Sequence, residues 1–165
     1  MNYRQPLLIA TTVLTGLTAG LFFGFSVSVN PAFLRLTDVQ YIAAMQAIND
    51  VIVNPVFMIA FMGPVFLLPV LGYSYAKQRS EGRLPLIIAA IAYVIGTFGV
   101  TVACNVPLND ALAAFDVAAA SPQQAAAARQ QFANPWNSWH TIRTVFNVIA
   151  LILLVVACTR RQRKQ

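Results

Sequence analysis

The chain contains few charged residues for its size. Of its 165 residues only 10% are charged, whereas 58% are hydrophobic, and the mean hydropathy is +0.66. A soluble globular domain carries roughly 25% charged residues. The composition therefore excludes an ordinary soluble domain and indicates an integral membrane protein.

Cysteine and histidine are also scarce, with two cysteines and a single histidine. The chain has no CxxC motif, and one histidine alone cannot furnish a zinc site. Cys104 and Cys158 fall toward opposite faces of the membrane on two predicted helices, about 30 Å apart, which excludes a disulfide between them. The sequence therefore predicts neither a metal site nor a disulfide framework.

Four apolar stretches are long enough to cross a hydrocarbon core, which takes about 20 residues. They predict helices over about 6–29, 55–76, 84–104 and 135–158. The first stretch is longer than the apolar region of a signal peptide, so we expect it to remain in the protein as a transmembrane helix. The expected fold is an all-α membrane protein: one four-helix transmembrane bundle over 1–165, with a basic tail at 159–165.

Proline and capping motifs predict the helix ends and the two outer loops. Pro31 and Pro107 are expected to end the first and third helices, because proline disfavours helix at the preceding residue. Thr37 and Gln40 form a capping box that predicts a short amphipathic helix over 38–50.

The second outer loop is rich in alanine from residue 108 to 132. A second capping box begins at Ser121, so two short surface helices are expected there, with a turn near Ser121. Asn134 and Pro135 have the form of an N-cap and a first-turn proline, which predicts the start of the fourth helix.

The basic residues are distributed by topology. Eight of the 11 fall in the two ends and the short second loop: Arg4, Lys77, Arg79, Arg83, Arg160, Arg161, Arg163 and Lys164. The positive-inside rule then places both termini in the cytoplasm, which suits a bacterial inner membrane. No groove-reading helix or interleaved aromatics accompany the charges, so we expect the lipid bilayer, and no nucleic acid, as their partner.

One face of the fourth helix carries polar groups into the membrane. At 3.6 residues per turn, Trp136, His140, Arg143 and Asn147 share that face. Polar side chains at membrane depth normally point into a bundle or a cavity. Histidine can act as a general base, and arginine can stabilise an oxyanion, so His140 and Arg143 are the candidate catalytic pair.

Other polar and aromatic residues are candidates for binding a substrate. They lie near the outer ends of the third and fourth helices or on the first outer helix: Asn105, Asn109, Asn137, Trp136, Trp139, Asn147, Gln46 and Asn49. Asparagines can orient a carbonyl or hydroxyl group, and tryptophans can stack on a planar ligand.

A purely structural interpretation accounts for the same residues. Tryptophan, histidine and arginine at an interface are typical of an aromatic belt with a snorkelling anchor. Arg143 would then pair with Asp110 or Asp116. Asn147 favours a functional site, because an amide one turn deeper in the membrane needs an interior partner.

The order of motifs resembles the anthrone oxygenase-like family of small four-helix membrane proteins. The motifs that carry the resemblance are Gly-Phe-Ser-Val in the first helix, Ala-Met-Gln-Ala-Ile-Asn49, Asn54-Pro-Val-Phe, Asn105-Val-Pro-Leu-Asn-Asp-Ala-Leu112 and Trp-x-x-His140-x-x-Arg143. The resemblance covers essentially the whole chain and is nearest to bacterial members, which are mostly a domain of unknown function.

The resemblance implies a cofactor-independent oxygenase that oxidises an aromatic or phenolic molecule with O₂, as fungal members convert an anthrone to an anthraquinone. It implies His140 as the base, with Arg143, Asn105 and Asn109 stabilising the oxyanion. Two other classes stay open: a membrane bundle that binds a quinone or a haem with one histidine ligand, and a transporter or accessory membrane subunit.

Overall fold

The computed structural model describes residues 3–159, and over these residues the chain is helical, with no strand. The elements run in the order α1 (Arg4–Gly24), α2 (Asn30–Phe33), α3 (Asp38–Ile52), α4 (Pro55–Lys77), α5 (Arg83–Ile91), α6 (Val106–Ala113) and α7 (Pro122–Thr159). Three π-helical segments, Phe25–Val29, Ala92–Gly99 and Thr101–Asn105, join α1 to α2 and α5 to α6. The all-α prediction is confirmed.

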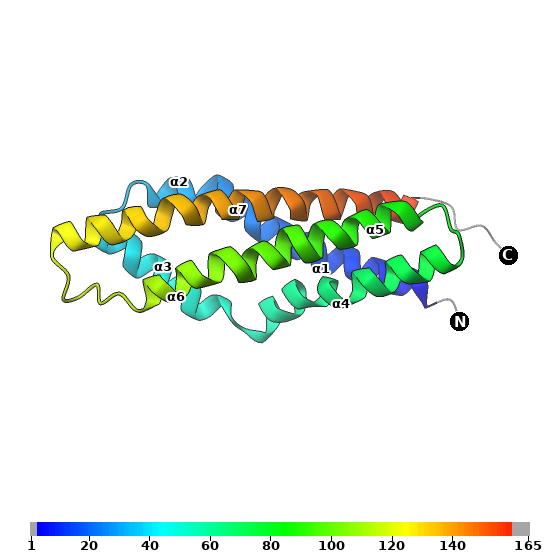
Figure 1. Ribbon diagram of the computed structural model, residues 1–165, viewed down its shortest axis with the longest axis horizontal. Coiled ribbons are helices and arrows are strands. Elements are labelled where there is room, and N and C mark those ends of the chain that lie inside the picture. The colour runs from blue at the N-terminus through cyan, green and yellow to red at the C-terminus, as the bar shows by residue number, and fades with distance from the viewer. Residues whose placement is uncertain (1–2, 160–165) are drawn as a thin grey trace.

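Four helices are long and apolar enough to cross a membrane, as predicted. They are Arg4–Phe33, Pro55–Lys77, Arg83–Ala113 and Pro122–Thr159. In the elongated bundle, α1 begins and α7 ends at the same end, here called the terminal end (Figure 1). In the half of the bundle that contains the terminal end, α1 and α5 each pack on both α4 and α7. Placement of the terminal end in the cytoplasm stays a prediction, and residues 160–165 of the basic tail lie outside the described residues.

The first and third spans do not end at their prolines, contrary to the sequence prediction. The first continues through Pro31 to Phe33, and the third continues through Pro107 to Ala113. A π-helical turn precedes each proline, and the residue before the proline donates its N–H to a carbonyl five residues back: Asn30 to Phe25 and Val106 to Thr101. The wider π turn makes room for the proline ring, which clashes with the preceding turn of a regular α-helix.

The fourth span begins earlier than predicted. Helix α7 starts at Pro122 and passes through Pro135 without a break, so Asn134 is not an N-cap, and the expected second short helix is the first part of α7. The capping box at Ser121 is confirmed: the Ser121 N–H donates to Gln124 Oε1 at 2.8 Å, and the Gln124 N–H donates to Ser121 Oγ at 3.3 Å. At 1.5 Å per residue, α7 is about 57 Å long, so its first half extends beyond a hydrocarbon core of about 30 Å.

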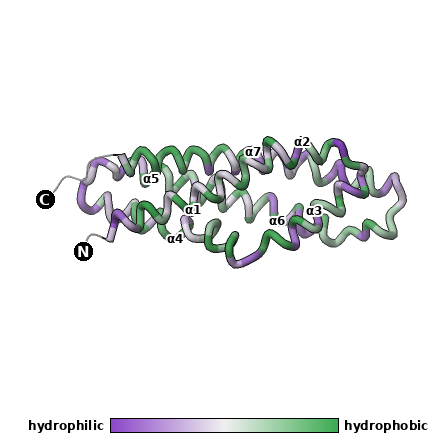
Figure 2. The backbone as a smooth tube through the Cα atoms, turned by 180° about the vertical axis from the view of Figure 1, so that it is seen from behind, coloured by the Kyte–Doolittle hydropathy of each residue, from purple (hydrophilic) through white to green (hydrophobic). Residues whose placement is uncertain are grey.

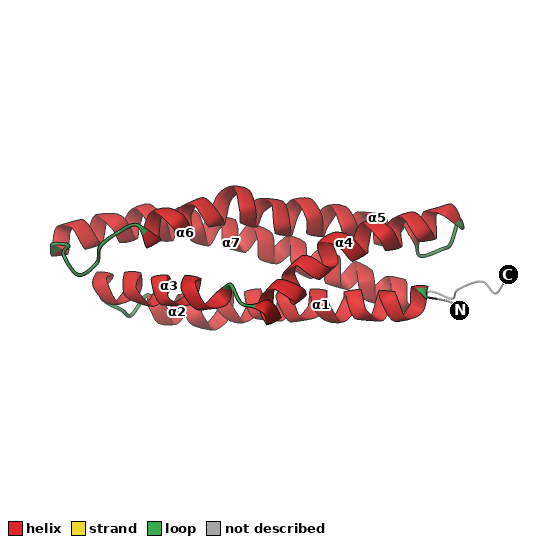
Figure 3. Ribbon diagram, turned by 90° about the horizontal axis from the view of Figure 1, so that it is seen from below, coloured by secondary structure: helices red, strands yellow, loops and turns green. Residues whose placement is uncertain are grey.

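The end opposite the termini, here called the distal end, is formed by α2, α3, α6 and the first half of α7 (Figures 1 and 3). Hydrophilic residues are concentrated there and at the terminal end, with apolar helix between them (Figure 2). Helix α3 confirms the predicted amphipathic helix, and its capping box at Thr37 and Gln40 forms as expected.

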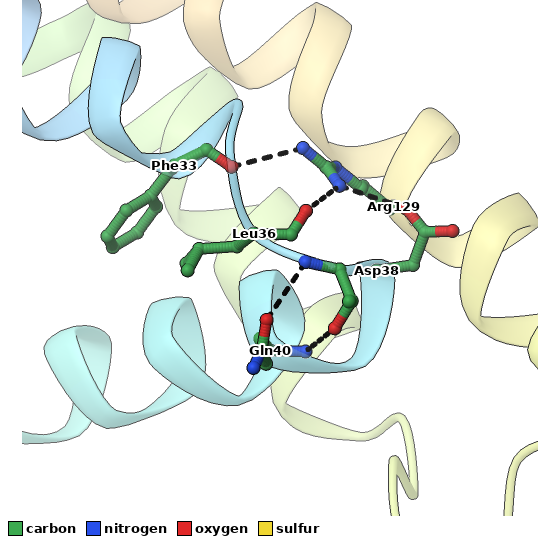
Figure 4. A network of polar contacts seen from close by, with 6 residues as sticks. Phe33, Leu36, Asp38, Gln40 and Arg129 are labelled. Carbon is green, nitrogen blue, oxygen red and sulfur yellow. Dashed lines mark hydrogen bonds and ion pairs between the residues drawn. The ribbon is translucent and has the colours of Figure 1, made fainter.

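At the distal end, Arg129 joins α7 to the segment between α2 and α3. From α7 its guanidinium donates to the Phe33 and Leu36 carbonyls and pairs with Asp38 at 3.0 Å (Figure 4). The same guanidinium lies 4.6 Å from the centre of the Tyr41 ring. Burial raises the pKa of Tyr41 to about 12, so the ring stays neutral at any physiological pH. Arg129 thereby fixes the loop before α3 against α7.

The apolar core is divided into two clusters by a polar layer. The terminal-end cluster includes Leu71, Leu86, Tyr93 and Leu154, and the distal-end cluster includes Ile42, Met45, Leu112, Phe132 and Trp136. Between them, the buried face of α7 changes from apolar to polar: His140, Arg143, Thr144 and Asn147. At the same level the buried face of the third span is also polar, with Thr97, Thr101 and Asn105 buried.

Two neighbouring helices satisfy the backbone of α4 where Pro64 interrupts it. Pro64 has no N–H to donate to the Ala60 carbonyl. The Thr18 hydroxyl of α1 donates to that carbonyl at 3.1 Å and shares its proton with the Leu14 carbonyl of its own helix at 3.2 Å. The Tyr93 hydroxyl of the third span donates to the next carbonyl of α4, on Phe61, at 2.9 Å. In lipid, where water cannot replace a lost partner, such bonds permit proline inside a transmembrane helix.

We expect Thr18→Val to destabilise the bundle by about 1–3 kcal/mol, because it leaves the Ala60 carbonyl buried without a donor. Thr11→Val is the matched control: Thr11 is also fully buried on α1, but its hydroxyl donates only to the Leu7 carbonyl of its own helix. Unfolding of the variants in detergent gives the comparison. In a Pro64→Ala background, which restores the backbone donor, Thr18→Val should cost less; equal losses for the two threonine variants would contradict this assignment.

Candidate functional site

The four residues predicted to share a face of α7 are all buried within the bundle. Trp136 is 4% exposed, His140 1%, Arg143 8% and Asn147 0%. The indole of Trp136 stacks on the imidazole of His140, with ring centres 4.9 Å apart and planes 8° from parallel. The α7 helix thus presents one continuous polar and aromatic strip to the other helices.

His140 is held at both ring nitrogens. On one side, Nε2 lies 3.0 Å from Ser26 Oγ and 3.2 Å from the Phe22 carbonyl, both in the first span. On the other side, Nδ1 lies 3.2 Å from Arg143 Nε and 3.0 Å from Arg143 Nη2. The rings of Phe22 and Phe25 complete the surroundings, with centres 5.7 and 5.5 Å from the imidazole.

These partners fix the tautomer of the imidazole. A guanidinium can only donate, so Nδ1 must carry the lone pair that accepts from Arg143. The Phe22 carbonyl can only accept, and the Ser26 hydroxyl already donates to that carbonyl at 3.0 Å. Nε2 therefore carries the proton and donates it toward Ser26 and Phe22. His140 is a neutral imidazole whose basic nitrogen is covered by Arg143.

Arg143 is a buried cation without an acidic partner among the described residues. It donates to His140 and, at 3.3 Å from Nη1, to the Thr101 hydroxyl. Its guanidinium carbon lies 4.3 Å from the centre of the Phe22 ring and 5.3 Å from that of Trp136. The predicted pairing with Asp110 or Asp116 is wrong: Arg129–Asp38 is the ion pair found in residues 3–159, because Arg143 points into the bundle while both aspartates lie on the distal end.

Two predicted asparagines of the third span lie against Trp136. Asn105 Nδ2 donates to the Trp136 carbonyl at 3.2 Å, and the Trp136 indole N–H donates to Asn109 Oδ1 at 2.7 Å. Asn105 is fully buried, and its Oδ1 has no hydrogen-bond partner. The π-helical segment that ends at Asn105 also carries Thr101, so one irregular stretch supplies two residues of the site.

The structure does not bring the remaining candidates into contact with His140 and Arg143. Gln46 donates to the Leu112 and Phe115 carbonyls and fastens α3 to the end of α6. Trp139 is 38% exposed, since it lies about 100° around α7 from His140. Asn49 and Asn137 are half-buried, each with one side-chain atom that is covered and unpartnered.

Sequence reasoning missed the contribution of the first span. Phe22, Phe25 and Ser26 all contact His140, and Ser26 lies in the π-helical segment Phe25–Val29. Phe25 and Ser26 belong to the Gly-Phe-Ser-Val motif of the first helix, which was the available signal, whereas Phe22 has none because phenylalanine is common in transmembrane helices. Thr101 was missed because threonine is common there too.

The comparisons bear on this arrangement. Residues 57–153 match the model of the anthrone oxygenase family. The chain belongs to that family. The match runs through α4 to α7 and contains Asn105, Asn109, Trp136, His140, Arg143 and Asn147. Phe22 and Ser26 lie outside the matched residues. No curated protein and no solved structure matched the chain.

The tautomer of this anthrone oxygenase family member can be measured directly, because His140 is the only histidine. In protein labelled with ¹⁵N-histidine, we expect one neutral imidazole with its proton on Nε2. Arg143→Met should shift the Nδ1 resonance, because its acceptor bond is lost, while the proton stays on Nε2 beside the Phe22 carbonyl. A wild-type spectrum with the proton on Nδ1, or of an imidazolium, would contradict the hydrogen bonds described above.

Proposed function

We propose that this protein binds a phenolic aromatic molecule with its oxygen beside Arg143, removes a proton from it to form an anion, and oxidises that anion with O₂. The observation that carries the proposal is the guanidinium of Arg143, 8% exposed and without a carboxylate partner in residues 3–159. Burying a charge costs several kcal/mol unless an opposite charge or good hydrogen bonds compensate it. A ligand oxygen that takes up negative charge supplies that compensation.

The surroundings of Arg143 favour an aromatic anion. Phe22, Phe25 and Trp136 present their rings around the imidazole and guanidinium, and planar ligands stack on such rings. The hydrogen bonds to His140 and Thr101 use three of the five N–H groups of a guanidinium and leave two for a ligand oxygen. The unpartnered Oδ1 of Asn105 accepts from a ligand hydroxyl.

The proposed reaction converts an activated methylene group into a carbonyl, as in anthrone + O₂ → anthraquinone + H₂O. Loss of a proton from the methylene carbon gives a delocalised oxyanion. That carbon then forms a bond to O₂, and the peroxide anion takes up a proton to become a hydroperoxide. Loss of the second C–H proton and cleavage of the O–O bond release water and leave the new carbonyl, so four electrons pass from the carbon to O₂.

His140 is the proposed base for the first step. Its Nδ1 lone pair accepts from Arg143 in the structure, so the base becomes available when Arg143 turns its guanidinium to the oxygen of the ligand. The same movement places the positive charge where the oxyanion develops. The Nε2 proton stays bonded to Ser26 and Phe22, which keeps the imidazole oriented.

We expect His140→Gln to lower the turnover of anthrone by about 10²–10⁴-fold, through loss of the general base. Arg143→Met should lower it by about 10²–10³-fold, through loss of oxyanion stabilisation. Oxygen consumption and anthraquinone absorbance measure the reaction. Ser138→Ala, an exposed change on the same helix, serves as the control and should have wild-type activity.

Unchanged turnover in His140→Gln would overturn the role of the base. The visible spectrum of the purified protein, before and after dithionite, tests the cofactor-free scheme, which a haem or flavin band near one per chain would overturn. Uptake of labelled phenol into proteoliposomes without chemical conversion would favour a transporter instead.

A further inference from the structure

Asn147 is the most completely unpartnered polar side chain in the polar layer. It is 0% exposed, and neither Oδ1 nor Nδ2 has a hydrogen-bond partner. It lies one turn from Arg143 on the same face of α7, toward the terminal end. An amide buried without partners is costly, so the group calls for an explanation.

Four of the hydroxyls in this region donate to backbone carbonyls. Thr18 donates to Ala60, Tyr93 to Phe61, Thr97 to Arg143, and Thr144 to His140. Each of these hydrogen bonds stabilises the fold, whereas the Asn147 amide forms no hydrogen bond within the described residues. Two contacts between α7 and the first span locate Asn147 along that span. His140 bonds to Ser26 on the distal side of Asn147, and Leu151 lies beside Gly16 on its terminal side.

We propose that Asn147 binds a second, neutral oxygen of the same ligand whose anionic oxygen lies at Arg143. The inference rests on the function proposed above and extends it to the ligand's shape and orientation. A neutral amide carries one donor group and one acceptor, which suits a hydroxyl or carbonyl oxygen, while the guanidinium takes the anion. The ligand class is therefore a planar phenol with oxygens at opposite edges, lying along α7 with the second oxygen toward the terminal end.

The test uses two probes, 2-naphthol and 2,6-dihydroxynaphthalene, titrated without O₂ into the full-length protein in detergent and followed by calorimetry. We expect the wild type to bind the dihydroxy probe about tenfold more tightly, the value of one added buried hydrogen bond. Asn147→Leu should reduce that preference to within twofold. Thr15→Val removes another buried, unpartnered hydroxyl and should keep the preference.

Thermal unfolding without ligand separates binding from structure. If Asn147 serves the ligand, Asn147→Leu unfolds at or above the wild-type temperature, because an apolar side chain of similar size replaces an unsatisfied amide. A lower unfolding temperature, with the probe preference retained, would show that the amide serves the fold and would overturn the inference.

The outcomes also distinguish this inference from the proposed function. If 2-naphthol binds, Arg143→Met weakens it, and the wild type shows no preference for the second hydroxyl, the role of Asn147 alone is wrong. If 2-naphthol does not bind, or binds equally to Arg143→Met, the anion site itself is wrong. Absence of the preference in the wild type overturns the inference even where Asn147→Leu does not fold.

Discussion

The buried guanidinium of Arg143 is the constraint around which the centre of the bundle is arranged. A cation at this depth needs hydrogen bonds and polarisable neighbours, and three helices supply them: His140 from α7, Thr101 from the third span, and the Phe22 ring from the first. The polar layer between the two apolar clusters exists because this charge cannot be surrounded by leucine and alanine alone.

The same layer depends on satisfying backbone carbonyls without water. Threonine and tyrosine hydroxyls reach across to neighbouring helices at the Pro64 interruption and at the Arg143 carbonyl. Such bonds hold neighbouring helices at a fixed register, because each joins one side chain to one particular carbonyl. They join the first and third spans to α4 and the third span to α7, and so help to position Phe22, Ser26 and Thr101 beside the histidine and arginine.

Much of the fold and part of the site could be predicted from the sequence. The four spans follow from hydropathy, and the strip of Trp136, His140, Arg143 and Asn147 follows from helical periodicity, which tertiary packing leaves intact. The continuation of the first and third spans through Pro31 and Pro107 could not be predicted, because a π-helical turn before each proline removes the clash that local rules assume. The contribution of Ser26 depends on how the first span packs against α7, which no local pattern encodes.

In the structure the proposed base, His140, and the cation of Arg143 are hydrogen-bonded to each other. Arg143 covers Nδ1 of His140, so neither the lone pair nor the full positive charge is presented to a neutral molecule. In the proposed reaction, a ligand oxygen able to carry negative charge competes with the imidazole for the guanidinium, and its binding to Arg143 frees the base beside the ligand. Binding and activation are then one event, and the Nε2 bonds to Ser26 and Phe22 keep the imidazole in place while its other side changes partner. In the proposed reaction, two residues one helical turn apart thereby make contact between the ligand oxygen and Arg143 the condition for proton transfer.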